Sequence, residues 1–511
     1  MVWRRWAALA LIVLVAGAST VAILGSRTLE PTLHQAIVHA LAHSLQSDVE
    51  LGQTRISWFP LRVRADGLTV RHHGRTDVPP LLVLKSFTID FKMSEVWNRT
   101  ADLVVIDGME ITIPPKGNGP RLPHSVSSGS NDDGGWITIR KLQATNVRLS
   151  VIPHNPDKNP RVWDIHSMVF NDIHHDGPAT YQASIINPIP FGTIESHGQF
   201  GPWQAGEPSD TPVKGDYTFA ADLGTIDGLG GHLDAKGSMN GIIEQIETTG
   251  ETSTEDFALT SLHAQSLPLR TKYSAVVDGT KGDVELRSVS VTLGHSQLHA
   301  KGTIEGAHGK KGKRVALNVK SNAVDVAEIM RLLVKGPSHT VRGTLVVDAA
   351  MDLPQGQNDI IDRLEVEGSA RAERVVFADA AIQDKVDTLS RRGQGRPDDA
   401  LIDDVASRMQ GQFQMKNGVV SFRELTFDVE GASVRLNGTH ALHPKTLDFE
   451  GEVRLHAPVS KTLTGFKTWL LKPIDPLFRK RGAGTLIAIR VAGTSEKPVV
   501  GIDLRKSIKG S

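Results

Sequence analysis

The chain has 511 residues, no cysteine, and equal numbers of basic and acidic residues, 57 Lys+Arg and 57 Asp+Glu. The lack of cysteine excludes disulfides, thiol catalysis and Cys-based metal sites, and it suits an exported protein. The balanced charge gives no broad positive field that would attract nucleic acid, so a nucleic-acid-binding role is disfavoured. The 48 glycines and an aromatic content of only 5% are typical of many short strands and turns.

The N-terminal residues direct the chain to a membrane. Residues 6–26 carry no charge, and at 1.5 Å per residue this run is long enough to span a bilayer. Because Arg4 and Arg5 precede it, we expect residues 1–5 in the cytoplasm, a transmembrane helix over 6–26, and the body of the protein on the far side. The alternative is a cleaved signal peptide, since Ala16-Gly17-Ala18 has the small-x-small form of a cleavage site.

The remainder is predicted to be mainly β with a few helices. An apolar residue recurs every fourth position from Leu29 to Leu45, which predicts an amphipathic helix over residues 28–47. Alternating apolar residues between glycines and prolines predict an N-terminal β region over 48–116. The following run, rich in Gly, Ser, Asn and Asp, predicts a flexible linker over 117–135, and strands resume in a middle β-groove region over 136–423.

Helices and glycines interrupt these strands. Asp325 with Glu328 forms a capping-box-like start to a short helix that ends at Gly336. Two more helical stretches are predicted within residues 380–409, the second with Leu401, Val405 and Met409 one turn apart. An apolar-x-Gly-Thr pattern recurs, as around Gly302 and Gly438, and it predicts strand ends at which glycine permits a bend.

The cleanest alternation lies in the last region, residues 424–511. The side chains predicted to share one apolar face, and to line a groove, are Val434, Leu436, Leu447, Phe449, Val453, Leu455, Ile487, Ile489 and Val491. Charged residues such as Asp448 and Glu452 fall on the opposite face. This division predicts an antiparallel sheet with one dry face.

A basic segment over residues 460–481 stands out in a chain of zero net charge. We expect an amphipathic helix here, and the side chains expected to contact an anionic membrane surface are Lys467, Trp469, Lys472, Phe478, Arg479, Lys480 and Arg481. The alternative is a helix packed over the end of the sheet with its lysines in water.

The sequence contains no recognisable catalytic, metal-binding or cofactor-binding motif, so we expect no enzyme, metal or cofactor. A long sheet with one apolar face must place that face against a second sheet, a layer of helices or an apolar ligand. The predicted helices are too few to cover it. A closed sandwich and a curled groove that binds acyl chains therefore remain as equal alternatives.

A resemblance to a known family favours the groove. A membrane span, an amphipathic helix and strands that contain Ile56–Leu61, Gly67–Val70 and Ile106–Ile111 resemble the start of the AsmA-like family of inner-membrane-anchored periplasmic proteins. The stretch from Gly201 to Val284 resembles the middle of such proteins, and the stretch from Leu425 to Pro498 resembles the AsmA C-terminal region. The resemblance covers most of the chain, and it implies an elongated curled antiparallel sheet that forms a chorein-like groove.

The resemblance also implies a function without catalytic residues. We expect a protein of the inner membrane with its body in the periplasm, whose groove shields phospholipid or other acyl chains for inter-membrane transport or outer-membrane biogenesis. Partners at the outer membrane would be compatible with this role. One alternative is a scaffold or chaperone for outer-membrane protein assembly, which would bind polypeptides along sheet edges. Another is an exported polysaccharide-active enzyme, which would need a carboxylate pair in a cleft.

Overall fold

The structure is a computed structural model. The residues that it describes are Val38, Ala42, 47–58, 60–72, 75–92, 94, 100–115, 138–152, 160–174, 177–204, 207–263, 265–307, 312–333, 341–458, 485–494 and 497–502. No helix within these residues is long and apolar enough to cross a membrane. The predicted membrane span at 6–26, the linker at 117–135 and the basic helix at 460–481 lie outside them.

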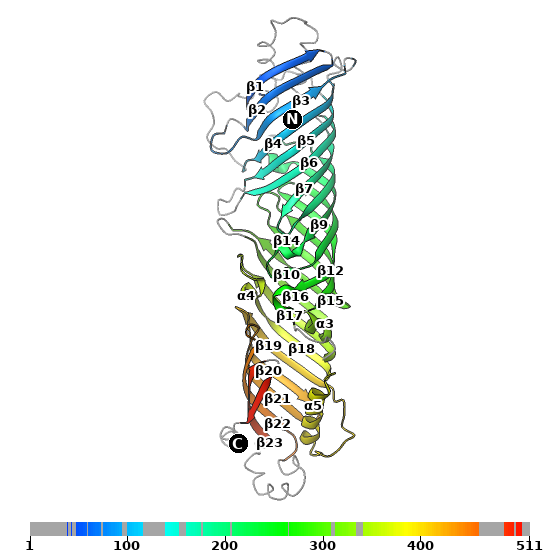
Figure 1. The fold of residues 1–511 in the computed structure, drawn as a ribbon, viewed down its shortest axis with the longest axis vertical. Helices are drawn as coiled ribbons and strands as arrows, with labels where there is room; N and C mark the ends of the chain where they lie inside the picture. The colour runs from blue at the N-terminus through cyan, green and yellow to red at the C-terminus, as the bar shows by residue number, and fades with distance from the viewer. Residues whose placement is uncertain are drawn as a thin grey trace.

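One curled, half-barrel sheet of β-strands runs along the full length of the molecule (Figure 1). Each strand pairs with the next one in the chain, except that the two-residue β10 pairs with β12 while β9 pairs with β11. The strands of the first section are β1 (Ser47–Trp58), β2 (Leu61–His72), β3 (Leu82–Asp90), β4 (Thr100–Ile113), β5 (Thr138–Val151), β6 (Arg161–Ile173), β7 (Ala179–Pro188) and β8 (Phe191–Phe200).

The sheet continues without a break through two further sections. The strands of the middle section are β9 (Pro212–Asp222), β10 (Leu229–Gly230), β11 (His232–Ile242), β12 (Gln245–Leu259), β13 (Leu267–Val277), β14 (Val284–Leu293), β15 (Ser296–Glu305) and β16 (Arg314–Asp325). The strands of the last section are β17 (Val341–Leu353), β18 (Glu365–Phe377), β19 (Ser407–Lys416), β20 (Val419–Val429), β21 (Ala432–Ala441), β22 (Thr446–Leu455), β23 (Thr485–Thr494) and β24 (Pro498–Ile502).

The sheet is antiparallel, as predicted, apart from one pair. β4 and β5 run parallel. Parallel neighbours need a connection of a dozen residues or more, because the chain has to return to the same end of the sheet. Such a length is present between Ile113 and Thr138. The predicted flexible linker therefore falls at the one place among the described strands where the topology requires a long connection.

The first section has a filled interior. In β2, the buried Leu61, Val63 and Ala65 alternate with the exposed Arg62 and Arg64, so the strand has one dry and one wet face. Buried residues of β2 to β7 form one continuous apolar cluster. Val38 and Ala42, which are helical, also pack against this cluster, in the segment where the sequence predicts an amphipathic helix.

Short helices occupy the ends of strands. The α-helices are α3 (Val326–Leu333), α4 (Ile360–Arg363) and α5 (Ala380–Gly393). Three 3-10 turns occupy similar positions earlier in the chain: η2 (Pro208–Asp210), η3 (Leu223–Thr225) and η4 (Thr260–Leu262). α5 begins at an Asp379 cap, whose carboxylate accepts hydrogen bonds from the amides of Ala381 and Ile382. The helix predicted after Asp325 and the first of the two predicted within 380–409 are confirmed.

The second helix predicted within 380–409 is wrong. Residues 398–406 form turns and bends, and Met409 lies inside β19. The error has a simple cause, because positions four apart share a face in a strand as well as in a helix. Met409 instead shares the face of Gly411, Phe413 and Met415, at alternate positions of β19.

The prediction that the Gly-Thr motifs mark strand ends is also wrong at two of them. Gly302 and Gly438 lie inside β15 and β21. A Cβ at Gly302 would lie 1.9 Å from the carbonyl oxygen of Ala316, and one at Gly438 would lie 2.2 Å from that of Asp448. Glycine therefore lets the neighbouring backbone enter the space that a side chain would occupy, and the sheet can curl tightly.

Replacing one large side chain in the first section and one in the last section should show whether the first section is more tightly packed. We expect Phe87→Ala to lower the free energy of unfolding by about 3–5 kcal/mol, because the Phe87 ring is 1% exposed and its removal leaves a cavity. Phe422→Ala, in β20, should cost less than half as much, because the Phe422 side chain is only half-buried. Urea unfolding followed by tryptophan fluorescence measures both. Equal losses would contradict a difference in packing between the two parts.

Candidate functional site

A single row of residues, linked by strand register, runs along one face of the sheet from β2 to β23. We call it the floor row. Its members are Ala65, Phe87, Ile106, Ala144, Met168, Ala183, Ser196, Tyr217, Gly237, Gly250, Tyr273, Val289, Ala300, Val319, Ala349, Gly368, Phe413, Phe422, Gly438, Phe449 and Val491. At about 4.8 Å between strands, the row is on the order of 95 Å long.

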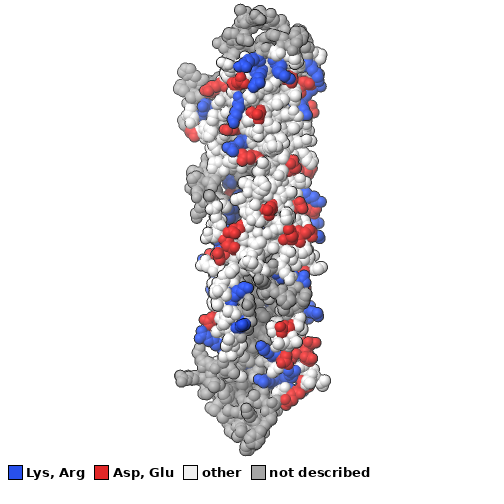
Figure 2. Space-filling model, in the orientation of Figure 1, with Lys and Arg blue, Asp and Glu red and all other residues white. Residues whose placement is uncertain are grey.

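The floor row lies on the apolar face, and the opposite face is charged. Outward side chains of neighbouring strands form exposed ion pairs, for example Lys236 with Glu251 at 2.9 Å and Lys320 with Asp348 at 2.9 Å. Figure 2 shows acidic and basic side chains distributed along the molecule without one dominant sign. Exposed pairs of this kind add little stability, but they keep the outer face wetted. One face of the sheet is thus charged and exposed to water, and the other is apolar.

All nine groove-lining residues predicted in the C-terminal region lie on the face of the floor row. Val434 pairs with Val453, which pairs with Ile487, and Leu436 is linked to Ile489 through Gly451. The remaining four occupy matching positions on the same face of β22 and β23: Leu447, Phe449, Leu455 and Val491. The side chains predicted to share a face therefore do so.

A helix covers part of this predicted lining. Val453, Leu455 and Ile487 belong to a cluster with Val386 of α5. These three positions are thus already in contact with protein. The predicted membrane-contact residues Lys467, Trp469, Lys472, Phe478, Arg479, Lys480 and Arg481 lie outside the described residues.

Aromatic side chains form a part of the floor that the sequence did not single out. The rings of Phe413 and Phe422 lie 6.4 Å apart between centroids, and those of Phe422 and Phe449 lie 6.0 Å apart. Phe413 and Phe422 come from β19 and β20, the two strands that precede the predicted lining, and the register places them in one row with Phe449. Their alternation within β19 and β20 was the signal that could have found them.

The floor row changes character along its length. In the first section its members are buried, from Ala65 to Ala183. From Val289 onward most are only half-buried, Val319 and Phe422 among them. The described part of the first section is therefore a packed core, and the accessible part of the groove lies in the middle and last sections.

The two rims of the groove, which are the two edges formed by the ends of its strands, meet beside α4. Ser261, which follows β12, donates a hydrogen bond of 2.5 Å to Asp359, which precedes α4. The apolar side chains of Leu262 and Ile361 are buried in the same contact. β12 and β17 are five strand spacings apart, about 24 Å along the sheet, so only the curl can bring their ends together. We call this contact the rim bridge; α4 lies beside β10 there (Figure 1).

The lack of native cysteine allows a direct test of the rim bridge. In a Ser261→Cys, Asp359→Cys double variant, we expect a thiol crosslinker that spans about 5 Å to join the two residues almost completely. An analogous Ser261→Cys, Asp448→Cys variant is the matched control, because Asp448 is exposed on the outer face of β22 and paired with Arg490. Mass spectrometry of proteolytic peptides measures the product. Crosslinking no better than in the control would show that the rims do not meet.

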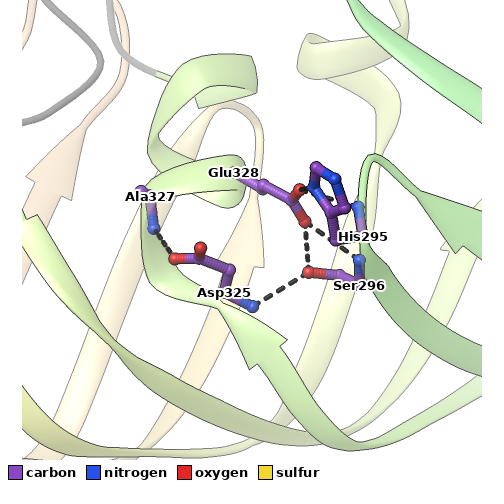
Figure 3. A network of polar contacts seen from close by, with 5 residues as sticks. All are labelled: His295, Ser296, Asp325, Ala327 and Glu328. Atoms are coloured by element: carbon purple, nitrogen blue, oxygen red, sulfur yellow. Dashed lines mark hydrogen bonds and ion pairs between the residues drawn. The ribbon is translucent and has the colours of Figure 1, made fainter.

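A buried carboxylate fixes α3 to the sheet (Figure 3). Glu328 accepts hydrogen bonds from the amides of His295 at 2.7 Å and Ser296 at 3.0 Å, and its side chain also contacts the His295 ring and the Ser296 hydroxyl. Burial alone would raise the pKa of Glu328, but these hydrogen bonds outweigh it and lower the pKa below its usual range. The turn between β14 and β15 is thus held against α3.

Acid should release α3. Because the folded-state pKa of Glu328 is lowered, its contribution is complete above the ordinary carboxyl range, near pH 4.3, and is lost as the pH falls below that range. Hydrogen exchange of the α3 amides, corrected for intrinsic rates, should therefore accelerate more on acidification than that of β12. Glu328→Gln should speed exchange at pH 7 by about tenfold or more and remove the extra pH dependence.

The matched control is Glu247→Gln, which changes an exposed carboxylate paired with Arg287 at 3.1 Å. It should leave α3 exchange unchanged. A Glu328→Gln protein with normal α3 protection at pH 7 would show that the carboxylate does not hold the helix.

The architecture and its floor define the class: an elongated protein built on one curled sheet with a long apolar groove. No protein-family model, no curated protein and no solved structure matches this chain. The resemblance to the AsmA-like family therefore rests on strand and turn patterns together with the long curled sheet. Within the described part of the chain, no three His, Asp or Glu side chains gather as a metal site would require.

Proposed function

We propose that the open part of the groove binds the acyl chains of phospholipid or another acyl lipid and leaves the headgroups in water at the slit between the rims. The observation that supports this is the half-buried apolar floor from Val289 to Val491. Burial of each CH₂ contributes about 0.8 kcal/mol, so an ordinary acyl chain has ample affinity without any specific polar contact. One bilayer leaflet is about 15 Å of hydrocarbon, so such a floor has room for several chains in file.

The membrane context of this proposal comes from the sequence. The uncharged run at 6–26 would anchor the chain, and the AsmA-like pattern would place its body in the periplasm. In that setting the protein handles lipid between membranes or during outer-membrane biogenesis, without chemistry of its own. Because the described first section is filled, lipid enters sideways through the slit and does not slide in from the anchored end.

One observation favours a second candidate, a scaffold for protein assembly. Val499 and Val500 of the last strand, β24, are 65% and 63% exposed. An exposed apolar edge strand is a template for pairing with another chain. Crosslinking in cells distinguishes the two candidates, because a scaffold captures polypeptide at this edge whereas a lipid groove does not need it.

A negative charge placed on the floor should expel lipid. We expect the full-length protein with Val319→Asp to co-purify with at least fivefold less lipid than the wild type, because a carboxylate among acyl chains would be desolvated without a partner. Asn318→Asp is the matched control, since it places the same charge one residue away on the exposed outer face of β16. Mass spectrometry of lipid extracted from detergent-free preparations measures the loading.

Val347→Trp provides a version of the test that keeps the floor apolar. It narrows the groove at the neighbouring strand β17 and should also reduce loading. Thermal unfolding verifies that each variant is folded. Absence of lipid from the wild-type protein, or equal loading in Val319→Asp and Asn318→Asp, would overturn the proposal.

A further inference from the structure

The floor row is interrupted by hydroxyl groups where the filled section gives way to the open groove. Tyr217 and Tyr273 lie in the same register row with only Gly237 and Gly250 between them. Because these two glycines have no side chains, the two tyrosines lie over them and their hydroxyl groups meet. Thr252 and Thr271 form a second hydroxyl pair one row away, at 2.7 Å.

The direction of hydrogen bonding in this network is fixed at one end by the backbone. Thr248 donates to the carbonyl oxygen of Ser238 at 3.0 Å, so its hydroxyl oxygen can only accept from Tyr217, 2.9 Å away. Tyr217 has then used its only proton and accepts from Tyr273. The chain of hydroxyls ends at Tyr273, whose oxygen keeps a lone pair that can accept one more hydrogen bond.

The threonine pair supplies the complementary group. Two hydroxyls that bond to each other use one proton, so within the described part of the chain either Thr252 or Thr271 retains a proton to donate. Thr271 and Tyr273 are two residues apart on one face of β13, a separation of about 6.6 Å along the strand. An acceptor and a donor are thus presented side by side on the floor of the groove.

We propose that this pair of sites, Tyr273 with Thr252 and Thr271, is a recognition subsite for a hydroxyl group carried on the acyl chain of the lipid. A hydroxyl is the group that can donate to the Tyr273 oxygen and can also accept from the threonine pair, so it matches either site. A plain methylene would leave both protein groups without a partner. This inference rests on the proposed lipid-binding function and adds selectivity to it.

The protonation state of the subsite suits a neutral ligand group. Burial, followed by the adjoining Tyr217 hydroxyl, raises the pKa of Tyr273 well above its usual value, so the phenol stays protonated throughout the physiological range. Tyr181 does not share this access, because it is buried and its hydroxyl is hydrogen-bonded to that of Ser196 at 2.9 Å. The chain has three tyrosines, so their functions can be separated by three Tyr→Phe variants.

A competition between saturated and hydroxylated chains tests the proposal. The full-length protein is equilibrated with octadecanoic acid and an equimolar set of its 3-, 10- and 12-hydroxy derivatives, and the bound species are quantified by mass spectrometry. We expect at least one hydroxy derivative to be enriched about three- to tenfold over the parent acid, the effect of one or two net hydrogen bonds. Tyr273→Phe and Thr271→Val should each reduce this enrichment, the ratio of bound hydroxy acid to bound parent acid, at least twofold.

Two controls separate the subsite from general effects. Thr218→Val removes a hydroxyl from the exposed outer face of β9, and Tyr181→Phe removes the buried hydroxyl of Tyr181. Both variants should keep the wild-type enrichment. Equal binding of all acids to the wild-type protein, or unchanged enrichment in Tyr273→Phe, would overturn the subsite while leaving the lipid groove intact. Failure of the wild-type protein to bind any of the acids would overturn both.

Discussion

Curvature of a single sheet is the constraint on which the rest of this molecule depends. Side chains alternate strictly between the two faces of a strand, so a sheet with one apolar face exposes a continuous apolar row unless something shields it. This chain shields that row by bending the sheet around it. Bending requires close backbone approach on the inner side, and glycines such as Gly302 and Gly438 provide it, since any side chain there would collide with the next strand.

The degree of closure then divides the molecule into a filled part and an open part. In the first section the curl brings large side chains such as Phe87 and Ile106 into one core, together with the helical Val38 and Ala42. Farther along, the helices that the structure describes lie at the rims, where α3 is held by Glu328 and α5 packs with Val453 and Leu455. Helices at the rims keep the floor between them accessible, which is what a groove requires and a sandwich does not.

The face on which each side chain lies could be predicted from the sequence, but the extent of its burial could not. Leu436, Phe449 and Ile489 were correctly placed on one face, because that depends only on local period. Phe87 is buried and Phe422 is only half-buried. This difference depends on how strongly the whole sheet curls, which no local sequence pattern indicates. The rim bridge joins residues 98 positions apart, Ser261 and Asp359. Tyr217 and Tyr273 likewise meet only because the register inserts two glycines between them.

The distribution of filled and open segments limits how a lipid could use the groove. A conduit that loads from the N-terminal end would need an accessible floor there, yet from Ala65 to Ala183 the described floor is buried by protein. In the proposed function, lipid access is instead lateral, between the two rims. The rim bridge then matters for the path as well as for the fold, because Ser261 and Asp359 span the opening above the middle section. An acyl chain that moves along the floor passes beneath this contact, whereas a headgroup that stays in water has to pass outside it, so movement past the bridge requires the contact to open.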